Sequence, residues 1–233
     1  IHVRRFEPHA GEKEYFVDKG AKRYQQVYNI VEPRWQPSEH RGLRTSPFYD
    51  RQQELGAEFY QSGGWESAQW YDSNADLVDE YAEQIPEQEG WQGINRSPIE
   101  AAEHLHTRDA VSMFDMTSFS SIIVEGPDAV DFLQRMCSND VDTAVGKVRY
   151  AVLLNEGGGI LGDVTVVRLD DDRYMVTTGG GNSPGIHGGW LKEHAPDTVS
   201  VQIQEGGKTT IGLWGPKSRL LLQRVTDADV SAE

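Results

Sequence analysis

The chain contains a carboxylate in a place where carboxylates are uncommon, at Asp163. It belongs to the run Ile160–Leu169, whose β-branched residues predict a strand, and Asp is normally depleted in strands. Side chains on a strand alternate between its two faces, so we expect Asp163 and Thr165 on the face opposite to Val164. A fixed carboxylate can orient a substrate amine and carry a proton, but a carboxylate that only faces water gives the same pattern.

The strand with Asp163 is expected to pair with the strand-like run that precedes it, Val148–Leu154. The connecting residues Asn155–Gly159 include three glycines, which can take the positive φ angles that a tight turn requires. The sequence therefore predicts a β-hairpin around this turn.

Other segments show helix and strand patterns. Ser97, Pro98 and Glu100 have the spacing of a capping box and predict a helix that runs to about Met113. Further helices are predicted over Gly11–Ile30, from about Pro47, over Asp128–Cys137, around Trp190 and over Lys217–Val225. Further strands are predicted near Phe59 and over Ser120–Glu125, Tyr174–Thr178, Val199–Gln204 and Thr209–Leu213. Strands paired by hairpins, with helices between them, predict an α+β fold with a mainly antiparallel sheet.

The segment Asp79–Asn95 is acidic, rich in Gln and interrupted by Pro86, Gly90 and Gly93. Such a composition indicates a surface loop or linker, and we place a domain boundary near it. We expect a small domain over residues 1–60, an acidic connecting segment over 61–96, and a larger domain over 97–233.

The net charge of −15 argues against nucleic acids and anionic membranes as partners, because the chain repels both. An acidic surface in which Arg outnumbers Lys also suits a salt-adapted, halophilic protein. The sequence shows neither a signal peptide nor an apolar run of membrane-spanning length, so we expect a soluble, cytoplasmic protein. Because the chain begins with Ile rather than Met, we expect it to be a piece of a longer polypeptide or processed material.

Several other candidate sites have weak patterns. Gly179–Gly181 lacks the Lys-Ser/Thr of a phosphate loop, and the sequence has no strand-GxGxxG-helix pattern that would hold FAD. His104 and His106 point in different directions on a helix, so we expect no metal site. The single cysteine, Cys137, cannot form an intrachain disulfide and is expected to be a buried apolar group rather than a nucleophile.

Six motifs follow one another between residues 114 and 218. They are Phe114–Phe119, Glu125–Ala129, Phe132–Arg135, Ser138–Val141, Asn155–Asp163 and Gly212–Ser218. Each is weak alone, but in this order they closely resemble the folate-binding domain of the glycine-cleavage T-protein (aminomethyltransferase) family. The resemblance implies tetrahydrofolate as the cofactor.

The N-terminal part resembles the small middle domain of dimethylglycine and sarcosine dehydrogenases. The segments that carry this resemblance are Arg5–His9, Tyr28–Ile30, Leu43–Tyr49, Leu55–Ala57, Gly64–Glu66 and Trp70-Tyr71. In that group, this domain joins an N-terminal FAD domain to a C-terminal T-protein-like module. The resemblance thus implies that FAD belongs to a domain missing upstream, and that the rest of the folate module is missing downstream.

The resemblance also assigns site residues. The family carboxylate that matches Asp163 lies beside the folate amines where the one-carbon unit is transferred, which gives Asp163 a catalytic role. By position, Phe119 and Tyr150 would line the folate cavity. Gly179 is placed among the folate-binding positions, although many aminomethyltransferases have Asn where this chain has Thr178-Gly179. Family contacts from Glu and Arg would lie beyond Glu233.

The leading hypothesis is part of a folate-dependent N-methyl amine dehydrogenase, of the dimethylglycine or sarcosine type, that transfers the released one-carbon unit to tetrahydrofolate. Its partners would be folate, a small N-methyl amine and the remaining parts of the same enzyme. One alternative is a stand-alone T-protein-like aminomethyltransferase or demethylase. Another is a folate-binding module without catalysis, against which the intact Asp163 argues.

Overall fold

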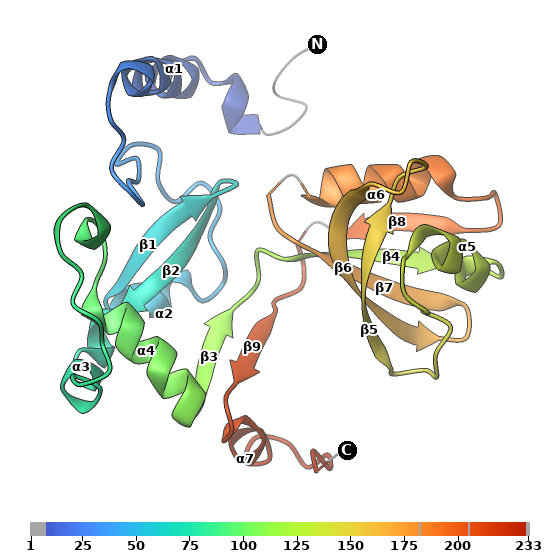
Figure 1. Ribbon diagram of the computed structural model, residues 1–233. Helices are drawn as coiled ribbons and strands as arrows, with labels where there is room; N and C mark the ends of the chain where they lie inside the picture. Colours follow the sequence, from blue (N-terminus) through green and yellow to red (C-terminus); the bar gives the residue numbers. More distant parts are fainter. Residues whose placement is uncertain (1–7, 182, 205, 232–233) are drawn as a thin grey trace. The chain divides into compact units, whose positions relative to one another are not determined.

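The computed structural model describes residues 8–181, 183–204 and 206–231 and divides into two compact units (Figure 1). Unit 1 contains the described residues up to 112 and from 213 onward, and unit 2 contains residues 113–212. The chain leaves unit 1 through β3 (Ser112–Asp115) and returns through β9 (Ile211–Trp214), and these two strands are hydrogen-bonded to each other. Among the described residues, none of the helices has the length and apolar character needed to cross a lipid bilayer.

Unit 1 contains one antiparallel hairpin and several short helices. Strands β1 (Ala57–Ser62) and β2 (Trp65–Tyr71) are joined by Gly63 and Gly64, both at positive φ, as a two-residue hairpin turn requires. The sequence predicted only the start of this hairpin, because the polar residues within β2 mask its alternation. The helices are η2 (Pro8–Gly11), α1 (Lys13–Tyr28), α2 (Tyr49–Glu54), η3 (Asp72–Asn74), α3 (Leu77–Glu80), η4 (Gly90–Gly93), α4 (Pro98–Asp109) and α7 (Ser218–Leu222).

Helix α4 begins where the sequence predicted. The Ser97 hydroxyl accepts a hydrogen bond from the Ile99 amide at 3.2 Å, and Pro98 is the first helical residue. The Glu100 carboxylate, predicted to complete a capping box, pairs with Arg34 instead. The helix ends at Asp109 rather than near Met113, because β3 begins at Ser112.

The hairpin of unit 1 is fixed by a carboxylate whose side chain is fully buried, Glu66. It accepts hydrogen bonds from the Arg41 guanidinium and, at 2.7 Å, from the Gly42 amide. Arg41 also donates to the Phe59 carbonyl at 3.0 Å, which connects the loop before α2 to β1. Burial acts to raise the pKa of Glu66, but the hydrogen bonds from Arg41 and Gly42 outweigh it and hold the pKa below its usual value.

Unit 2 is built on a five-stranded sheet in which every pair of neighbours is antiparallel, in the order β5-β6-β7-β4-β8. The predicted α+β fold with a mainly antiparallel sheet is therefore confirmed. The strands are β4 (Ser120–Glu125), β5 (Val148–Leu154), β6 (Ile160–Asp170), β7 (Arg173–Thr178) and β8 (Ser200–Gln204).

Two helices, α5 (Ala129–Met136) and α6 (Ser183–His194), contribute to the core on one face of this sheet. Residues from α5, α6 and alternate positions of the strands form one contiguous apolar cluster. Its fully buried members include Ile122, Val124, Leu133, Leu153, Tyr174, Val176 and Leu191. The side chains at the intervening strand positions point to the other face, on which the predicted site residues of the sheet are found.

Candidate functional site

The four site residues predicted from the sequence all belong to unit 2. Asp163 lies on β6 and Tyr150 on the neighbouring β5, whereas Phe119 directly precedes β4 and Gly179 directly follows β7. The sheet therefore brings together residues that are up to 60 positions apart in the sequence (119 to 179).

Asp163 lies on the face of β6 that turns away from the core. Its neighbour Val164 is only 2% exposed and belongs to the core cluster, whereas Asp163 is exposed. This alternation confirms the predicted orientation of the strand. Among the residues that the structure describes, the Asp163 carboxylate has no hydrogen-bond or ion-pair partner. It is therefore available to an amine that approaches this face.

Tyr150 stands on the same face as Asp163. It pairs across the hairpin with Thr165, two residues along β6 from Asp163, and it is 62% exposed. Diagonal neighbours in an antiparallel pair lie roughly 7–8 Å apart, within reach of an aromatic side chain. Tyr150 and Asp163 can thus contact one small molecule together.

Phe119 and Gly179 lie at one end of the β4–β7 pair. Ser120 and Thr178 are partners there, and Phe119, which is 43% exposed, stands one position before Ser120. The two segments approach closely, because a Cβ at Gly180 would lie 2.5 Å from the Ser118 carbonyl oxygen. If the β4–β7 and β6–β7 registers are extended by one or two residues, Phe119, Gly179 and Asp163 fall at the same level of the sheet.

A row of polar residues crosses the sheet beside Asp163, which the sequence analysis did not foresee. The strand register aligns Tyr150 with Thr165, Thr165 with Thr177, Thr177 with Ser121 and Ser121 with Gln204. The side-chain oxygen of Gln204 is buried without a hydrogen-bond partner among the described residues. The row offers hydroxyl and amide groups to a polar ligand on this face. The sequence feature that could have indicated this row is a Ser or Thr at the same level of three predicted strands.

The turn before Asp163 is organised by the side chain of Asn155. Its oxygen accepts hydrogen bonds from the Gly157 amide at 3.0 Å and from the Gly159 amide at 2.8 Å. Of the three turn glycines, only Gly158 takes a positive φ, at 79°. A Cβ at Gly159 would crowd the Asn155 side chain, because it would lie 2.9 Å from the amide nitrogen. The predicted tight turn is present, and one of its three glycines takes a positive φ.

The motif Ser138–Val141 covers part of the free edge of β5. The Ser138 amide donates to the Val152 carbonyl at 3.0 Å, and the Val152 amide donates to the Ser138 hydroxyl at 3.2 Å. The Asn139 side chain donates to the Tyr150 carbonyl at 2.9 Å. These contacts fix the backbone that carries Tyr150, a role that the sequence pattern alone does not reveal.

His187, in a glycine-rich segment of α6, was not predicted from the sequence as a site residue. Its side chain is buried in the apolar core, with the residue 7% exposed. Nδ1 is hydrogen-bonded to the Thr178 hydroxyl, and Nε2 lies 3.3 Å from the Leu161 carbonyl oxygen. The sequence feature that could have indicated this contact is Gly162, because a glycine inside a β-branched strand indicates the close approach of another group.

Cys137 gives no sign of further chemistry. Cys137 is buried in the core cluster, and burial raises the pKa of its thiol to about 11, so the reactive thiolate is disfavoured. This confirms the prediction of a buried apolar group. In the described ranges, no three His, Cys, Asp or Glu side chains are gathered as a metal site would require.

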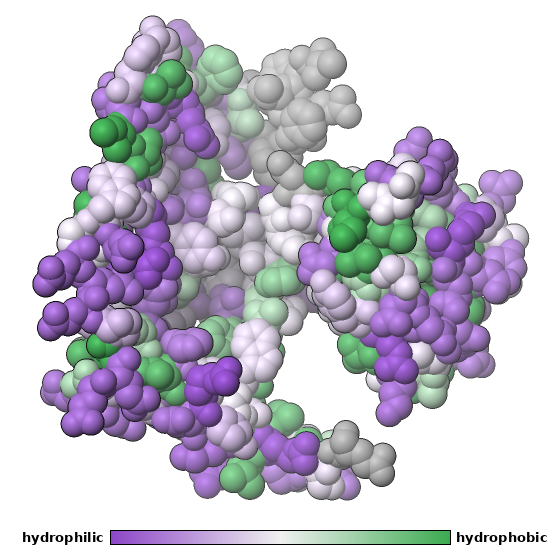
Figure 2. Space-filling view, in the orientation of Figure 1, coloured by the Kyte–Doolittle hydropathy of each residue, from purple (hydrophilic) through white to green (hydrophobic). Residues whose placement is uncertain are grey.

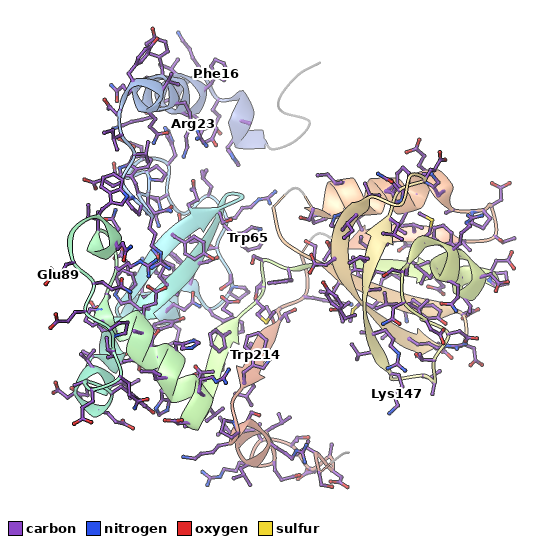
Figure 3. The ribbon with its side chains drawn as sticks, in the orientation of Figure 1. Phe16, Arg23, Trp65, Glu89, Lys147 and Trp214 are labelled. Atoms are coloured by element: carbon purple, nitrogen blue, oxygen red, sulfur yellow. The ribbon has the colours of Figure 1, made fainter. Side chains whose placement is uncertain are left out.

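The surface of unit 2 also carries apolar side chains. Figure 2 shows hydrophobic surface gathered where β6 and the start of α6 lie, and these elements carry the exposed Ile160 and Ile186. In Figure 3, Lys147 marks the loop that leads into β5. Asp163 therefore lies on a strand that also exposes an apolar side chain, Ile160.

Comparison with known proteins assigns both parts of the chain. Residues 48–233 match the GCVT N-terminal domain, and residues 1–46 match the FAD dependent oxidoreductase central domain. The chain is 31% identical over its whole length to 4-methylaminobutanoate oxidase (formaldehyde-forming) from Paenarthrobacter nicotinovorans, of which it spans 27%. It is 28% identical to an aminomethyltransferase from Bacillus subtilis over 82% of this chain and 45% of the relative. It thus spans less than half the length of these relatives.

A solved structure shows the same fold. The aminomethyltransferase T of the glycine cleavage system from Bartonella henselae superimposes with a TM-score of 0.64 and 27% sequence identity, over 82% of this chain and 46% of the other. Because the GCVT match covers most of the sequence, the chain belongs to the T-protein (aminomethyltransferase) family and joins that fold to the central domain of an FAD-dependent oxidoreductase.

Proposed function

We propose that this chain is the folate-binding part of an FAD-dependent N-methyl amine dehydrogenase, of the dimethylglycine or sarcosine type, which passes the released one-carbon unit to tetrahydrofolate. Two findings support this proposal. An oxidoreductase central domain directly precedes a T-protein domain, and the relative matched over the whole chain is named for oxidation of a methylamino substrate. In the proposed enzyme, this order of domains couples an amine-oxidising region to a one-carbon acceptor site.

The observation that carries the proposal is the orientation of Asp163. An exposed carboxylate, fixed on a strand and diagonal to Tyr150, is suited to bind the amines of a reduced pterin. Tetrahydrofolate, when bound, supplies the nitrogen atoms that accept the one-carbon unit. Asp163 would accept a hydrogen bond from such a nitrogen, stabilise positive charge near it and take up or return its proton.

The neighbouring residues suit the same ligand. Tyr150 and Phe119 are exposed aromatic side chains that can stack on a flat ring, and Gly179 leaves room beside them. We therefore propose Asp163 as the catalytic residue and Phe119, Tyr150 and Gly179 as folate-binding residues. FAD would bind to another part of the enzyme, since this sequence lacks the glycine-rich pattern that holds a dinucleotide.

In a second candidate function, the protein has the same fold but does not transfer the one-carbon unit to tetrahydrofolate. The relative from Paenarthrobacter is named a formaldehyde-forming oxidase, and its match covers the whole of this chain. In that case the one-carbon unit would leave the enzyme as formaldehyde, and the sheet face with Asp163 would not act on it. The two functions differ in a measurable product.

The test replaces Asp163 in the full-length enzyme that we propose and measures formaldehyde and methylene-tetrahydrofolate from the same turnover. Asp163→Ala should leave amine oxidation intact and strongly reduce carbon transfer, with formaldehyde released instead. Asp163→Asn keeps the size but removes the charge, and we expect transfer to fall by roughly one to two orders of magnitude, the scale for one acid–base group.

The matched control is Asp170→Asn, which changes another exposed aspartate on β6 at the far end of the strand. It should transfer carbon as the wild type does. If Asp163→Ala also partitions carbon as the wild type does, Asp163 is only a solvated carboxylate and the proposal is wrong. If the wild type itself releases all carbon as formaldehyde with tetrahydrofolate present, the second function is correct.

A further inference from the structure

His187 is a polar residue in an apolar core, on the side of the sheet opposite to Asp163. It is 7% exposed and stands on α6, which packs against β4, β6, β7 and β8. Burial of an imidazole is costly unless its nitrogens find partners. Both do so here, one on β6 and the other on β7.

The two partners of His187 lie next to the proposed site residues. Its Nε2 faces the carbonyl oxygen of Leu161 at 3.3 Å, two residues before Asp163. Its Nδ1 is hydrogen-bonded to the hydroxyl of Thr178, a buried residue directly before Gly179. In the neutral tautomer that fits both contacts, Nε2–H donates to Leu161 and Nδ1 accepts from Thr178. One side chain thus connects the two strand ends that carry the site.

Gly162 gives an independent indication of how close this contact is. A Cβ at Gly162 would lie 2.2 Å from Nε2 and 2.3 Å from Cε1 of His187. Its φ is not positive, so Gly162 is required by the space that the ring occupies and not by the backbone conformation. The imidazole therefore packs directly on the residue that precedes Asp163.

We propose that His187 is a positioning residue, which fixes the backbone of β6 at Asp163 and the end of β7 at Gly179 through Leu161 and Thr178. This inference rests on the function proposed for Asp163. His187 itself does not touch the substrate, because it lies in the core behind the sheet. Its effect on the reaction comes from the placement of the carboxylate, to which catalytic rates are sensitive.

The first experiment tests the contact without using activity. Gly162→Ala, His187→Ala and the double variant are compared by chemical unfolding of the chain. We expect Gly162→Ala to lower the unfolding midpoint when His187 is present and to leave it unchanged or raise it when residue 187 is Ala, because Ala suits a strand better than Gly does. Additive effects would show that the ring and Gly162 are not in contact and would overturn the proposal.

The second experiment tests positioning in the enzyme. His187→Leu fills the same space without hydrogen bonds, and His187→Gln keeps a donor and an acceptor. We expect His187→Leu to reduce the rate of carbon transfer roughly ten- to a hundredfold with little change in the KM for tetrahydrofolate, and His187→Gln to restore part of that rate. Met136→Ala, a core change in α5, serves as the control for general destabilisation.

Amide hydrogen exchange is measured on the same variants and separates this inference from the proposed function. In His187→Leu, exchange should rise at residues 161–163 and 178–179 more than in Met136→Ala. If Asp163→Ala abolishes transfer but His187→Leu transfers as the wild type does, His187 only fills the core and the inference is wrong. If Asp163→Ala has no effect, the proposed function is wrong, and the exchange result alone decides whether His187 holds the strand ends.

Discussion

The two units are stabilised by different kinds of contact. The buried hydrophobic residues described in unit 1 are Phe59, Tyr81, Ala102 and Ala110, half of which are alanines. Its buried positions also include Gln52 and the ion-paired Glu66. Unit 2 instead has a contiguous apolar cluster contributed by the sheet, α5 and α6. Among its described residues, the buried polar ones are Thr178 and His187, which are hydrogen-bonded to each other.

This difference predicts how each unit responds to its surroundings. Apolar burial does not titrate and is hardly weakened by moderate salt, whereas ion pairs and buried carboxyl groups depend on pH. Unit 2 should therefore give the site a rigid support under many conditions. Unit 1 should be the part whose stability changes with pH.

The largest effect is expected from a truncation in the core of unit 2. Leu133 is fully buried on α5, away from the site, and Leu133→Ala should lower the free energy of unfolding by about 2–5 kcal/mol. Chemical unfolding measures the loss, and hydrogen exchange should locate the increased opening in unit 2. A loss of unfolding free energy that is the same from pH 5 to pH 8 would support the view that apolar burial stabilises unit 2. Opening confined to unit 1 would contradict it.

A loss near the middle of that range is expected when the ion pair of unit 1 is broken. Glu66→Ala leaves the Arg41 guanidinium and the Gly42 amide without their partner and should cost about 3 kcal/mol, the low end for buried pairs, because Arg41 is still partly hydrated. Unfolding curves and exchange in β1 and β2 measure it. Glu58→Ala, an exposed change on β1, is the control. Equal effects from the two variants would mean that the pair does not stabilise the hairpin.

Glu103 gives a pH test, because its pKa is shifted in the direction opposite to that of Glu66. Burial raises the pKa of this carboxyl, which accepts hydrogen bonds from the Tyr71 amide at 2.9 Å and from Asn74 at 2.7 Å. A raised pKa in the folded state contributes stability below the ordinary value of 4.5, and this contribution is lost as the pH rises through the folded pKa. Glu103→Gln should therefore stabilise unit 1 at neutral pH, on the order of 0.5–1 kcal/mol. The gain should vanish near pH 4, and a gain independent of pH would refute this account.

The smallest effect concerns Cys137. Because it is buried and its thiol pKa is about 11, it should not react with iodoacetamide at pH 8 while unit 2 is folded. Mass spectrometry after timed labelling checks this, with urea-unfolded chain as the positive control. Rapid labelling under native conditions would show that the core of unit 2 opens readily.

The elements of unit 2 were easier to predict than those of unit 1, because the two units are stabilised by different kinds of contact. The strands over Ser120–Glu125 and Val148–Leu154 were predicted with the bounds that the structure has, because their β-branched residues are packed against a core. In unit 1, β2 was missed, since polar contacts and not apolar alternation hold it in place. The three-part division at residues 60 and 96 stays a prediction.

The site could be predicted only in part. The orientation of Asp163 follows from strand alternation, and the structure has it on the expected face. The diagonal placement of Tyr150 requires the hairpin register, which a bulge near Leu154 shifts and no local pattern specifies. The contacts of His187 join segments 26 residues apart, so they depend on how α6 packs on the sheet. The folate roles of the four residues stay predictions.

The hydrogen bonds that Ser138 and Asn139 make along β5 have a consequence for association between molecules. β5 is the outermost strand of its sheet, and an uncovered outer strand is a template for pairing with another chain. Here part of its carbonyl row is already occupied by the chain's own polar side chains and backbone. Strand addition by another chain is thereby hindered at the part of β5 that carries Tyr150.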